Sequence, residues 1–412
     1  MVINYNDYKN DGWGLSKLGF EKLYELISNN PKENLRILEF GSGVSTKFFS
    51  DLSKILDKHI EVTSFDNSDE FMYKDTSNPD VVVNLRPLDE TDDTGFKQMF
   101  VDKIFNSKLM KRKTSKHLMN MFYSLKSDDL SGVYDYMLLD GPHGNGRSLA
   151  FLLANTHLVG DSVIFIDDYT HYDFVDRFLS IYDADEIFRH IAGNTDKWKL
   201  GGDFIIFKLK KYVMENITVV DFKFAQSNDE YDEKYIQDGA WSRPYEYKYV
   251  IEFIKNSYIS GEIEPPKIHN SSWGFEGIHV TFRDELDTLG TMCLHSDIRN
   301  SDFRETYYYD ITTLNDTFKN KYDYVINVST IEHLATANER IKSINNLFDQ
   351  VKPNGYLILT FDYPRVNLNE IETLVGRKCE SPMIPLNGEN SINSNKNYKD
   401  LNIVYLILKK NG

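Results

Sequence analysis

A short apolar run that breaks into two glycines constrains the fold of the first half of the chain more than any other stretch. Residues 37–46 read Ile-Leu-Glu-Phe-Gly-Ser-Gly-Val-Ser-Thr. Residues 35–40 predict a buried parallel strand, and residues 46–56 predict the helix that follows it. Gly41 and Gly43 let the backbone turn tightly and approach a ligand without an intervening Cβ. The stretch is typical of a nucleoside-binding turn in an open α/β domain.

The residues around this turn limit which nucleoside it can hold. A dinucleotide turn of the Gly-x-Gly-x-x-Gly type needs a third glycine, and Thr46 occupies that position. Glu39 stands two residues before the first glycine, where an acid disfavours a phosphate and suits a cationic or zwitterionic ligand. Asp66 follows a second predicted strand, residues 59–65, at the place where such folds bind ribose hydroxyls. The predicted cofactor-binding residues are Glu39, Gly41, Ser42, Gly43, Ser45 and Asp66.

Length and composition indicate two domains and argue against a nucleic-acid partner, a membrane span and a disulfide framework. The chain has 412 residues, of which 41% are apolar, enough for two cores. A polar stretch at residues 216–238 separates two strand-rich halves, so we predict domains at 1–213 and 214–412. The net charge of -16 argues against a nucleic-acid partner, because phosphate contacts need clustered lysine and arginine. No apolar stretch is long enough to span a membrane, and two cysteines are too few for a disulfide framework, which predicts a cytoplasmic protein.

Acidic residues end neighbouring strands of the first predicted sheet. After the strands at 35–40 and 59–65, further strands are predicted at 80–85, 133–139, 161–166 and 202–208, with a helix at 172–182. Ligands of such sheets bind beyond the carboxyl ends of the strands. Asp140 follows one strand and the pair Asp167-Asp168 follows the next, so the three side chains should converge there. Packed carboxylates repel unless a cation lies among them, and oxygen ligands suit Mg²⁺, so we predict that Asp140, Asp167 and Asp168 bind a divalent metal.

These motifs resemble those of class I S-adenosylmethionine (SAM) methyltransferases. The glycine turn is similar to their motif I, and Ile166-Asp167-Asp168-Tyr169 is similar to the metal site of Mg²⁺-dependent O-methyltransferases that act on sugars or catechols. The run Leu139-Asp140-Gly141-Pro142-His143-Gly144 resembles the Asp-Gly-x-His element of that group. The resemblance covers residues 12–209 and implies that the cofactors are SAM and a divalent metal, Mg²⁺.

Methyl transfer to oxygen gives the predicted catalytic residues their roles. A metal held by Asp140 and Asp168 would bind acceptor oxygens and lower the pKa of a hydroxyl. His143 is the leading general base, because an imidazole titrates near neutral pH; a purely structural histidine in this turn is the alternative. By resemblance, the acceptor is a small polyhydroxylated molecule, a sugar or glycan precursor. Trp13 is interpreted as a core residue, with closure over the site as the alternative. Residues 86–131 form a polar insertion where acceptor-specific lids occur. A homo-oligomer is left open.

The second half resembles another SAM-methyltransferase domain that lacks the glycine turn. Residues 322–334 and 351–357 are similar to the fourth- and fifth-strand regions of such a domain. Its turn should lie at residues 267–275, which contain no acid-x-Gly-x-Gly. Either Ser271, Ser272 and Gly274 form a variant turn, or this half has lost SAM binding; the bulk of Trp273 and Phe275 favours loss. His269, His279, His295 and His333 have no metal-site spacing and are interpreted as core or surface residues.

The predicted fold class is therefore α/β, with two tandem Rossmann-like domains that each hold a mostly parallel, doubly wound sheet. The leading hypothesis is a SAM-dependent O-methyltransferase. Two alternatives remain. One is a nucleotide-sugar-binding oxidoreductase or epimerase, against which the missing third glycine counts. The other is a non-catalytic interaction protein made of two degenerate folds.

Overall fold

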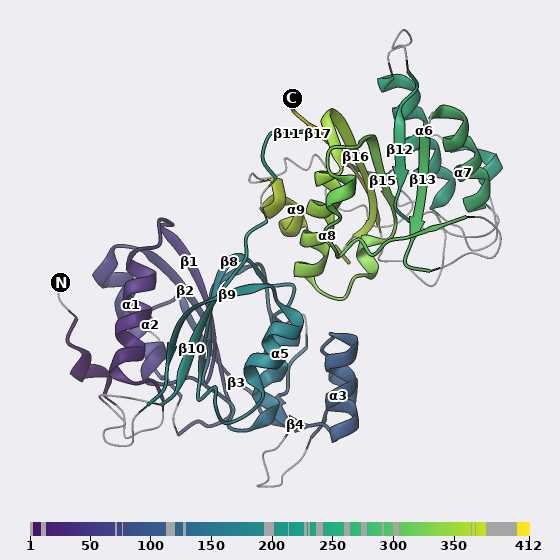
Figure 1. Cartoon of the computed structure of the whole chain (residues 1–412). Coiled ribbons are helices and arrows are strands. Elements are labelled where there is room, and N and C mark those ends of the chain that lie inside the picture. The colour runs from purple at the N-terminus through teal and green to yellow at the C-terminus, as the bar shows by residue number, and fades with distance from the viewer. Residues whose placement is uncertain are drawn as a thin grey trace. The chain divides into compact units, whose positions relative to one another are not determined.

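The chain folds into two compact units, residues 1–211 and 212–412 (Figure 1). The sequence placed the end of the first domain at residue 213. In this computed structural model no described helix is long and apolar enough to cross a membrane. The described residues are 3–9, 14–70, 72–75, 77–112, 120–126, 129–192, 202–212, 214–225, 229, 231–235, 242–258, 264–272, 278–290, 292–299, 305–363, 365–366, 368–375 and 402–412.

The first unit is built on a seven-stranded sheet with the order β3-β2-β1-β7-β8-β10-β9. Strands β3, β2, β1, β7 and β8 are mutually parallel, and β10 runs antiparallel between β8 and β9. Strand β9 was not predicted from the sequence. The bounds are β1 (Asn34–Phe40), β2 (His59–Asp66), β3 (Val81–Leu85), β7 (Tyr134–Leu139), β8 (Leu158–Asp167), β9 (Ala184–His190) and β10 (Phe204–Leu209).

Helices cover both faces of this sheet because each central strand is apolar on both sides. Helices α1 (Lys17–Ser28) and α2 (Val44–Leu56) enclose one core with residues such as Ile37 and Leu138. Helices α3 (Asp93–Asp102), α4 (Leu149–Leu153) and α5 (Phe174–Ile181) enclose the other, with residues such as Leu38 and Leu139. Successive residues of a strand point to opposite faces, so β1 and β7 each feed both cores. The first unit is thus doubly wound.

The polar insertion between β3 and β7 is a folded structure of its own. It carries α3 and a three-stranded antiparallel sheet of order β5-β4-β6. These strands are short: β4 (Leu88–Glu90), β5 (Lys111–Arg112) and β6 (Met121–Tyr123). All three residues of β6 are buried, and Phe122 and Tyr123 belong to the core that α3, α4 and α5 share. The insertion therefore packs on the first sheet.

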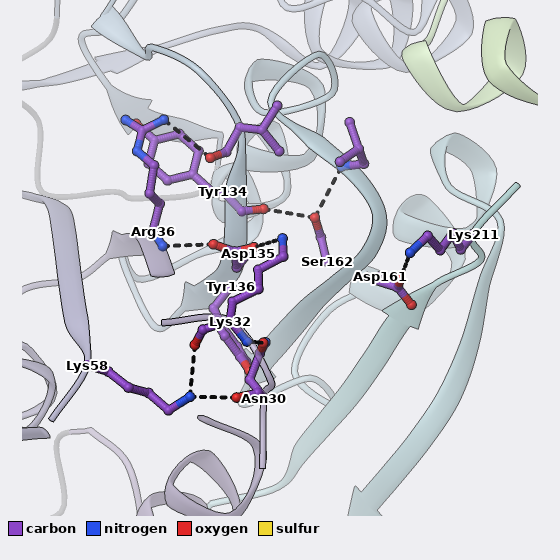
Figure 2. A network of polar contacts seen from close by, with 12 residues as sticks. Asn30, Lys32, Arg36, Lys58, Tyr134, Asp135, Tyr136, Asp161, Ser162 and Lys211 are labelled. Atoms are coloured by element: carbon purple, nitrogen blue, oxygen red, sulfur yellow. Dashed lines mark hydrogen bonds and ion pairs between the residues drawn. The ribbon is translucent and has the colours of Figure 1, made fainter. Parts of the chain in front are cut away.

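Polar side chains tie together the amino ends of the strands, opposite the glycine turn (Figure 2). Asp135 of β7 accepts hydrogen bonds from Lys32 Nζ (2.5 Å) and from the backbone N–H of Arg36 in β1 (2.9 Å). Lys58 Nζ donates to the carbonyl oxygens of Asn30 (2.5 Å) and Lys32 (2.8 Å). These charged side chains are paired within the fold, so the contacts at this end of the sheet stabilise the first unit.

The second unit repeats this plan with the sheet order β11-β17-β16-β15-β12-β13-β14. Strands β16, β15, β12, β13 and β14 are parallel, and β17 runs antiparallel between β16 and β11. The bounds are β11 (Ile217–Phe224), β12 (Lys267–Asn270), β13 (Met292–Asp297), β14 (Tyr307–Tyr308), β15 (Tyr322–Val328), β16 (Val351–Tyr363) and β17 (Asn402–Lys410).

The helices of the second unit are α6 (Arg243–Ser257), α7 (Ile278–Leu289), α8 (Ala337–Asp349) and α9 (Leu368–Val375). Helices α6 and α7 share a core with the central strands, and α8 packs on β16. The polar stretch at residues 216–238 was expected to separate the domains, and that expectation was wrong in part, because it contains β11. The polar residues of that stretch follow the strand, at residues 226–238, whereas β11 itself is mostly apolar.

The two sheets confirm the predicted fold class of two tandem Rossmann-like domains. In the first unit, β2 and β3 lie on one side of β1, and β7 and β8 lie on the other. In the second unit, β13 and β14 lie on one side of β12, and β15 and β16 lie on the other. An antiparallel strand next to the far edge completes both. The order reverses beside β1 in the first unit and beside β12 in the second, and ligands of such sheets bind at that reversal.

Candidate active site at the carboxyl ends of the strands

The glycine turn lies at the reversal point, against the loop that follows β7. Gly41 has φ +102° and donates its N–H to Phe65 O (2.8 Å). A Cβ at this position would lie 2.8 Å from the backbone nitrogen of Gly141. Gly141 itself donates to Phe40 O (2.6 Å), so the two loops are in direct backbone contact. Glycine is required here by both the dihedral angle and the space.

Glu39 is buried completely at the end of β1 and is only half satisfied. Its Oε2 accepts hydrogen bonds from Ser64 Oγ (2.6 Å) and Thr46 Oγ1 (2.5 Å). Its Oε1 is buried and has no hydrogen-bond partner among the described residues. Burial raises the pKa of Glu39 to about 7. A ligand that brings an N–H donor or a positive charge to Oε1 would offset this unsatisfied acceptor.

Asp66 fixes the glycine turn to the end of β2. The backbone N–H of Ser42 donates to Asp66 Oδ2, and that of Ser68 donates to Oδ1, both at 2.8 Å. Desolvation by burial raises the pKa of Asp66. Ser45 is buried in the first turn of α2. The predicted cofactor-binding residues are thus brought together around one turn, with Asp66 beside Ser42 as the spacing suggested.

Asp140, which follows β7, and Asp167, which ends β8, lie close to each other and to Arg147. Asp140 is half-buried and Asp167 is buried, and their carboxyl groups lie close enough for each to act on the pKa of the other. Burial, with the neighbouring carboxylates of Asp140 and Asp168, raises the pKa of Asp167 well above its ordinary value. Burial also raises the pKa of Asp140, and the positive charge of Arg147 opposes that rise. The buried Arg147 donates to Asp167 O and Pro142 O, both at 3.0 Å.

The third aspartate stands to one side of this pair. Asp168 has φ +52°, is only partly buried, and places Oδ2 3.8 Å from His171 Nδ1. These described aspartates do not bring one oxygen each within 4.8 Å of one another. The positive charge of Arg147 lowers the pKa of both Asp140 and Asp167, so a cation already lies near these two carboxyl groups. The three carboxylates are not gathered around one point as a metal site requires.

His143 and Trp13 are the least supported of the predicted functional residues. The side chain of His143 is exposed in the turn after β7, and among the described residues no hydrogen bond to it is found. Trp13 lies outside the described residues. Ser16 caps α1, since its Oγ accepts from Gly19 N (3.1 Å).

Tyr123 is a residue of this site that the sequence did not reveal. It comes from β6 of the insertion, and a Cβ on Gly141 would lie 2.6 Å from its hydroxyl oxygen, so the phenol rests on that loop. Burial raises its pKa well above the ordinary value, and the nearby charges of Asp66 and Arg147 act on it in opposite directions. No local pattern marks it, because β6 reaches the site only through pairing with β4.

The second unit places different residues at the matching strand ends. Ser329 follows β15 where Asp140 follows β7, and its Oγ donates to Glu246 Oε1 (2.6 Å). The buried Glu246 comes from α6 and also pairs with Arg243. Burial would raise the pKa of Glu246, but Arg243 and hydroxyl donors lower it overall. Of the expected turn, Ser271 and Ser272 are described, whereas residues 273–277 lie outside the described residues.

Glu332 is the least satisfied acid of this second cluster. It is 6% exposed, and neither carboxylate oxygen has a hydrogen-bond partner among the described residues. Burial, followed by the charge of Asp362, raises its pKa to about 8. His269 is a core residue held by Gln350 (2.6 Å) and Ser296 (2.7 Å). The second unit therefore differs from the first in the chemistry of its strand ends, although the fold is the same.

Comparisons with known proteins give partial structural likeness only. No known family model and no curated protein matches the chain. A TehB-like SAM-dependent methyltransferase from Corynebacterium glutamicum is 15% identical over 45% of this chain and 86% of its own, with a TM-score of 0.26. The N-methyltransferase NodS from Bradyrhizobium japonicum is 10% identical over 43% and 100%, with a TM-score of 0.31. A putative S-adenosylmethionine-dependent methyltransferase from Listeria monocytogenes is 10% identical over 39% and 97%, with a TM-score of 0.25. Because these scores are below 0.5, the assignment of two tandem Rossmann-like domains rests on the sheet orders of the chain itself.

Proposed function

We propose that the first unit binds SAM at the glycine turn and transfers its methyl group to a hydroxyl of a small polyhydroxylated acceptor, a sugar or glycan precursor. The observation that carries this proposal is the half-satisfied, fully buried carboxyl of Glu39 beside the turn. SAM is a zwitterionic nucleoside whose amino group and sulfonium both carry positive charge. An acid with a free acceptor oxygen suits such a ligand and opposes a diphosphate.

The turn also argues against the dinucleotide alternative. Thr46 stands at the third glycine position, and its Oγ1 accepts from the backbone N–H of Gly43 (3.0 Å) while it donates to Glu39. Its side chain thus takes up a backbone donor that a pyrophosphate would use. An oxidoreductase or epimerase with a bound dinucleotide would need the backbone N–H of Gly43 as a donor and the space that the Thr46 side chain fills.

The chain's own residues supply the positioning and the proton acceptor. When bound, SAM supplies a methyl group on a sulfonium sulfur. Removal of the acceptor's O–H proton as the new C–O bond forms requires a base within hydrogen-bond reach. The Asp140 and Asp167 pair fits this role because burial raises the pKa of both carboxyl groups, which makes them stronger bases than an exposed aspartate. His143, exposed at the rim of the same loop, is the second candidate base.

Divalent-metal assistance through Asp140, Asp167 and Asp168 stays a prediction of the sequence. Transfer measured with Mg²⁺ and with EDTA tests it, and Asp168→Ala is the matched variant. If the carboxyl pair acts as the base without metal, EDTA and Asp168→Ala leave the rate within about twofold of the parent. A loss on EDTA that Mg²⁺ restores would instead support the metal site.

Ligand binding by the full chain tests the first half of the proposal. Isothermal titration with SAM, S-adenosylhomocysteine and NADH should give binding of the first two only. Glu39→Gln should weaken SAM binding by about tenfold or more, since one charged hydrogen bond contributes about 1.5–3 kcal/mol. The matched control is Glu61→Gln, an acid exposed on β2 that pairs with Arg36. Binding of NADH, or undiminished SAM binding by Glu39→Gln, would contradict the proposal.

Methyl transfer itself is tested by mass spectrometry of candidate sugar acceptors incubated with SAM, which should gain one methyl group. Asp167→Asn should lower the rate about 10²- to 10⁴-fold and leave SAM affinity unchanged. Asp185→Asn, exposed on β9, is the control and should behave as the parent. SAM binding without transfer to any hydroxyl acceptor would favour a non-catalytic role for the unit.

A further inference from the structure

Three side chains with different donor atoms meet between α7 and β13 of the second unit. Cys293 and His295 are two residues apart on β13, so they share the face that α7 covers. Asp287 lies near the end of α7. One donor atom from each of the three lies within 4.8 Å of the other two, and Asp287 Oδ1 is 2.9 Å from His295 Nε2. Among the described residues, this is the one such set of histidine, cysteine and acid side chains.

The set is partly open to solvent. His295 is buried, Cys293 is half-buried and Asp287 is exposed. A Cβ on Gly290 would lie 2.8 Å from Cys293 Sγ, so glycine is required there for the sulfur to lie against the backbone of residue 290. The burial gradient places the imidazole and thiol inside and the carboxylate at the rim, which leaves a direction from which an ion and a water can enter.

Neighbouring polar groups orient two of the three donors. Arg283 Nε lies 3.9 Å from Asp287 Oδ2, the oxygen that does not face His295. Asn270 Nδ2 lies 3.4 Å from His295 Nδ1, while the buried Asn270 Oδ1 has no hydrogen-bond partner among the described residues. A 180° rotation of that amide would let Oδ1 accept the Nδ1–H of His295. The lone pair of Nε2 would then face the Asp287 carboxylate, an arrangement that a cation bound to both groups would stabilise.

We propose that Asp287, Cys293 and His295 bind one divalent transition-metal ion, with zinc as the preferred metal and water in a fourth position. Thiolate, imidazole and carboxylate are all zinc ligands, and a thiolate disfavours the hard ions Mg²⁺ and Ca²⁺. The spacing was not recognisable in the sequence, because Asp287 joins the other two only when α7 packs on β13. The site is independent of the function proposed for the first unit.

The balance of protons follows from the contacts of the thiol. Cys293 Sγ donates to Leu286 O (3.1 Å) and burial keeps it in the thiol form. Binding of the ion displaces that proton to solvent, so one metal–sulfur bond replaces one S–H bond without any change of oxidation state.

Cobalt(II) titration of the full chain tests the site directly, because a cobalt–thiolate bond gives a near-ultraviolet charge-transfer band. The parent should bind one equivalent with that band, and added Zn²⁺ should abolish it. Cys293→Ser should remove the band, and Asp287→Asn should weaken binding by about tenfold or more. Cys379→Ser, which changes the other cysteine of the chain, should leave the spectrum unchanged.

The exposed position of Asp287 makes Asp287→Asn a variant that should fold, and circular dichroism checks both it and Cys293→Ser. Absence of a charge-transfer band in the folded parent would overturn the proposal. So would a band that survives Cys293→Ser, or an affinity that a folded Asp287→Asn variant retains.

Discussion

Replacing Glu39 with glutamine should change how the stability of the first unit depends on pH. Burial raises the pKa of Glu39 from 4.5 to about 7. The folded state therefore holds this proton more tightly than the unfolded state does. The resulting stabilisation is fully present below pH 4.5 and is lost as the pH rises towards 7. At about 1.4 kcal/mol per pH unit, the loss amounts to about 3 kcal/mol.

The glutamine variant cannot ionise and should lack this loss. Its side-chain carbonyl can still accept from Ser64 and Thr46, as Glu39 Oε2 does. Between pH 4.5 and pH 8, the free energy of unfolding of the first unit should fall by about 3 kcal/mol more in the parent than in Glu39→Gln. Urea unfolding followed by hydrogen exchange and mass spectrometry of β1 peptides reports on this unit separately from the second.

Glu61→Gln serves again as the control and should follow the parent at every pH. If Glu39→Gln shows the same pH dependence as the parent, the buried carboxyl does not carry the proposed penalty. Loss of SAM binding together with higher stability at pH 8 would identify Glu39 as a residue kept for binding at a cost to the fold.

Three substitutions test the packing around both sheets. Gly41→Ala should destabilise the first unit by about 1–3 kcal/mol and prevent SAM binding, because its Cβ would meet Gly141; urea unfolding and titration measure the two effects. Arg340→Met removes the partner of the buried Glu370, whose oxygens lie 2.7 Å from the guanidinium, and should cost about 3–5 kcal/mol in unfolding of the second unit. Ser16→Ala should cost about 1 kcal/mol through loss of the α1 cap, and a decrease in urea midpoint without a change in slope would show it.

The central strands of the first unit were predictable because their local patterns agree with their burial. The strand expected at residues 35–40 is β1 (Asn34–Phe40), and that expected at 59–65 is β2 (His59–Asp66). Both contain buried apolar residues and end at an acid or a glycine turn, so the apolar pattern and the residues that follow it mark the same limits. Strand β9 was missed because half of its residues are exposed at the sheet edge.

Some residues of the candidate site could also be predicted from local sequence patterns, and others could not. Residues that end adjacent parallel strands must lie close together, which is why Asp140 and Asp167 meet. The contact of Tyr123 with this loop depends on the insertion folding back, and the charge balance with Arg147 depends on where a long side chain points. Neither is encoded in a short window of sequence.

Strand β11 can join the sheet of the second unit only after β17 has been synthesised, because it pairs with β17. Strand β11 is made first, yet the strand that hydrogen-bonds to it follows residues 225–401. At about 5–20 residues per second, the ribosome needs roughly 10–35 s to synthesise that interval. Throughout this time β11 has no place in the sheet, because β17 alone connects it to β16. Nascent chains of this protein should therefore carry an unpaired strand until β17 has been synthesised, and a chaperone that covers extended apolar segments would have its greatest effect on yield during this interval.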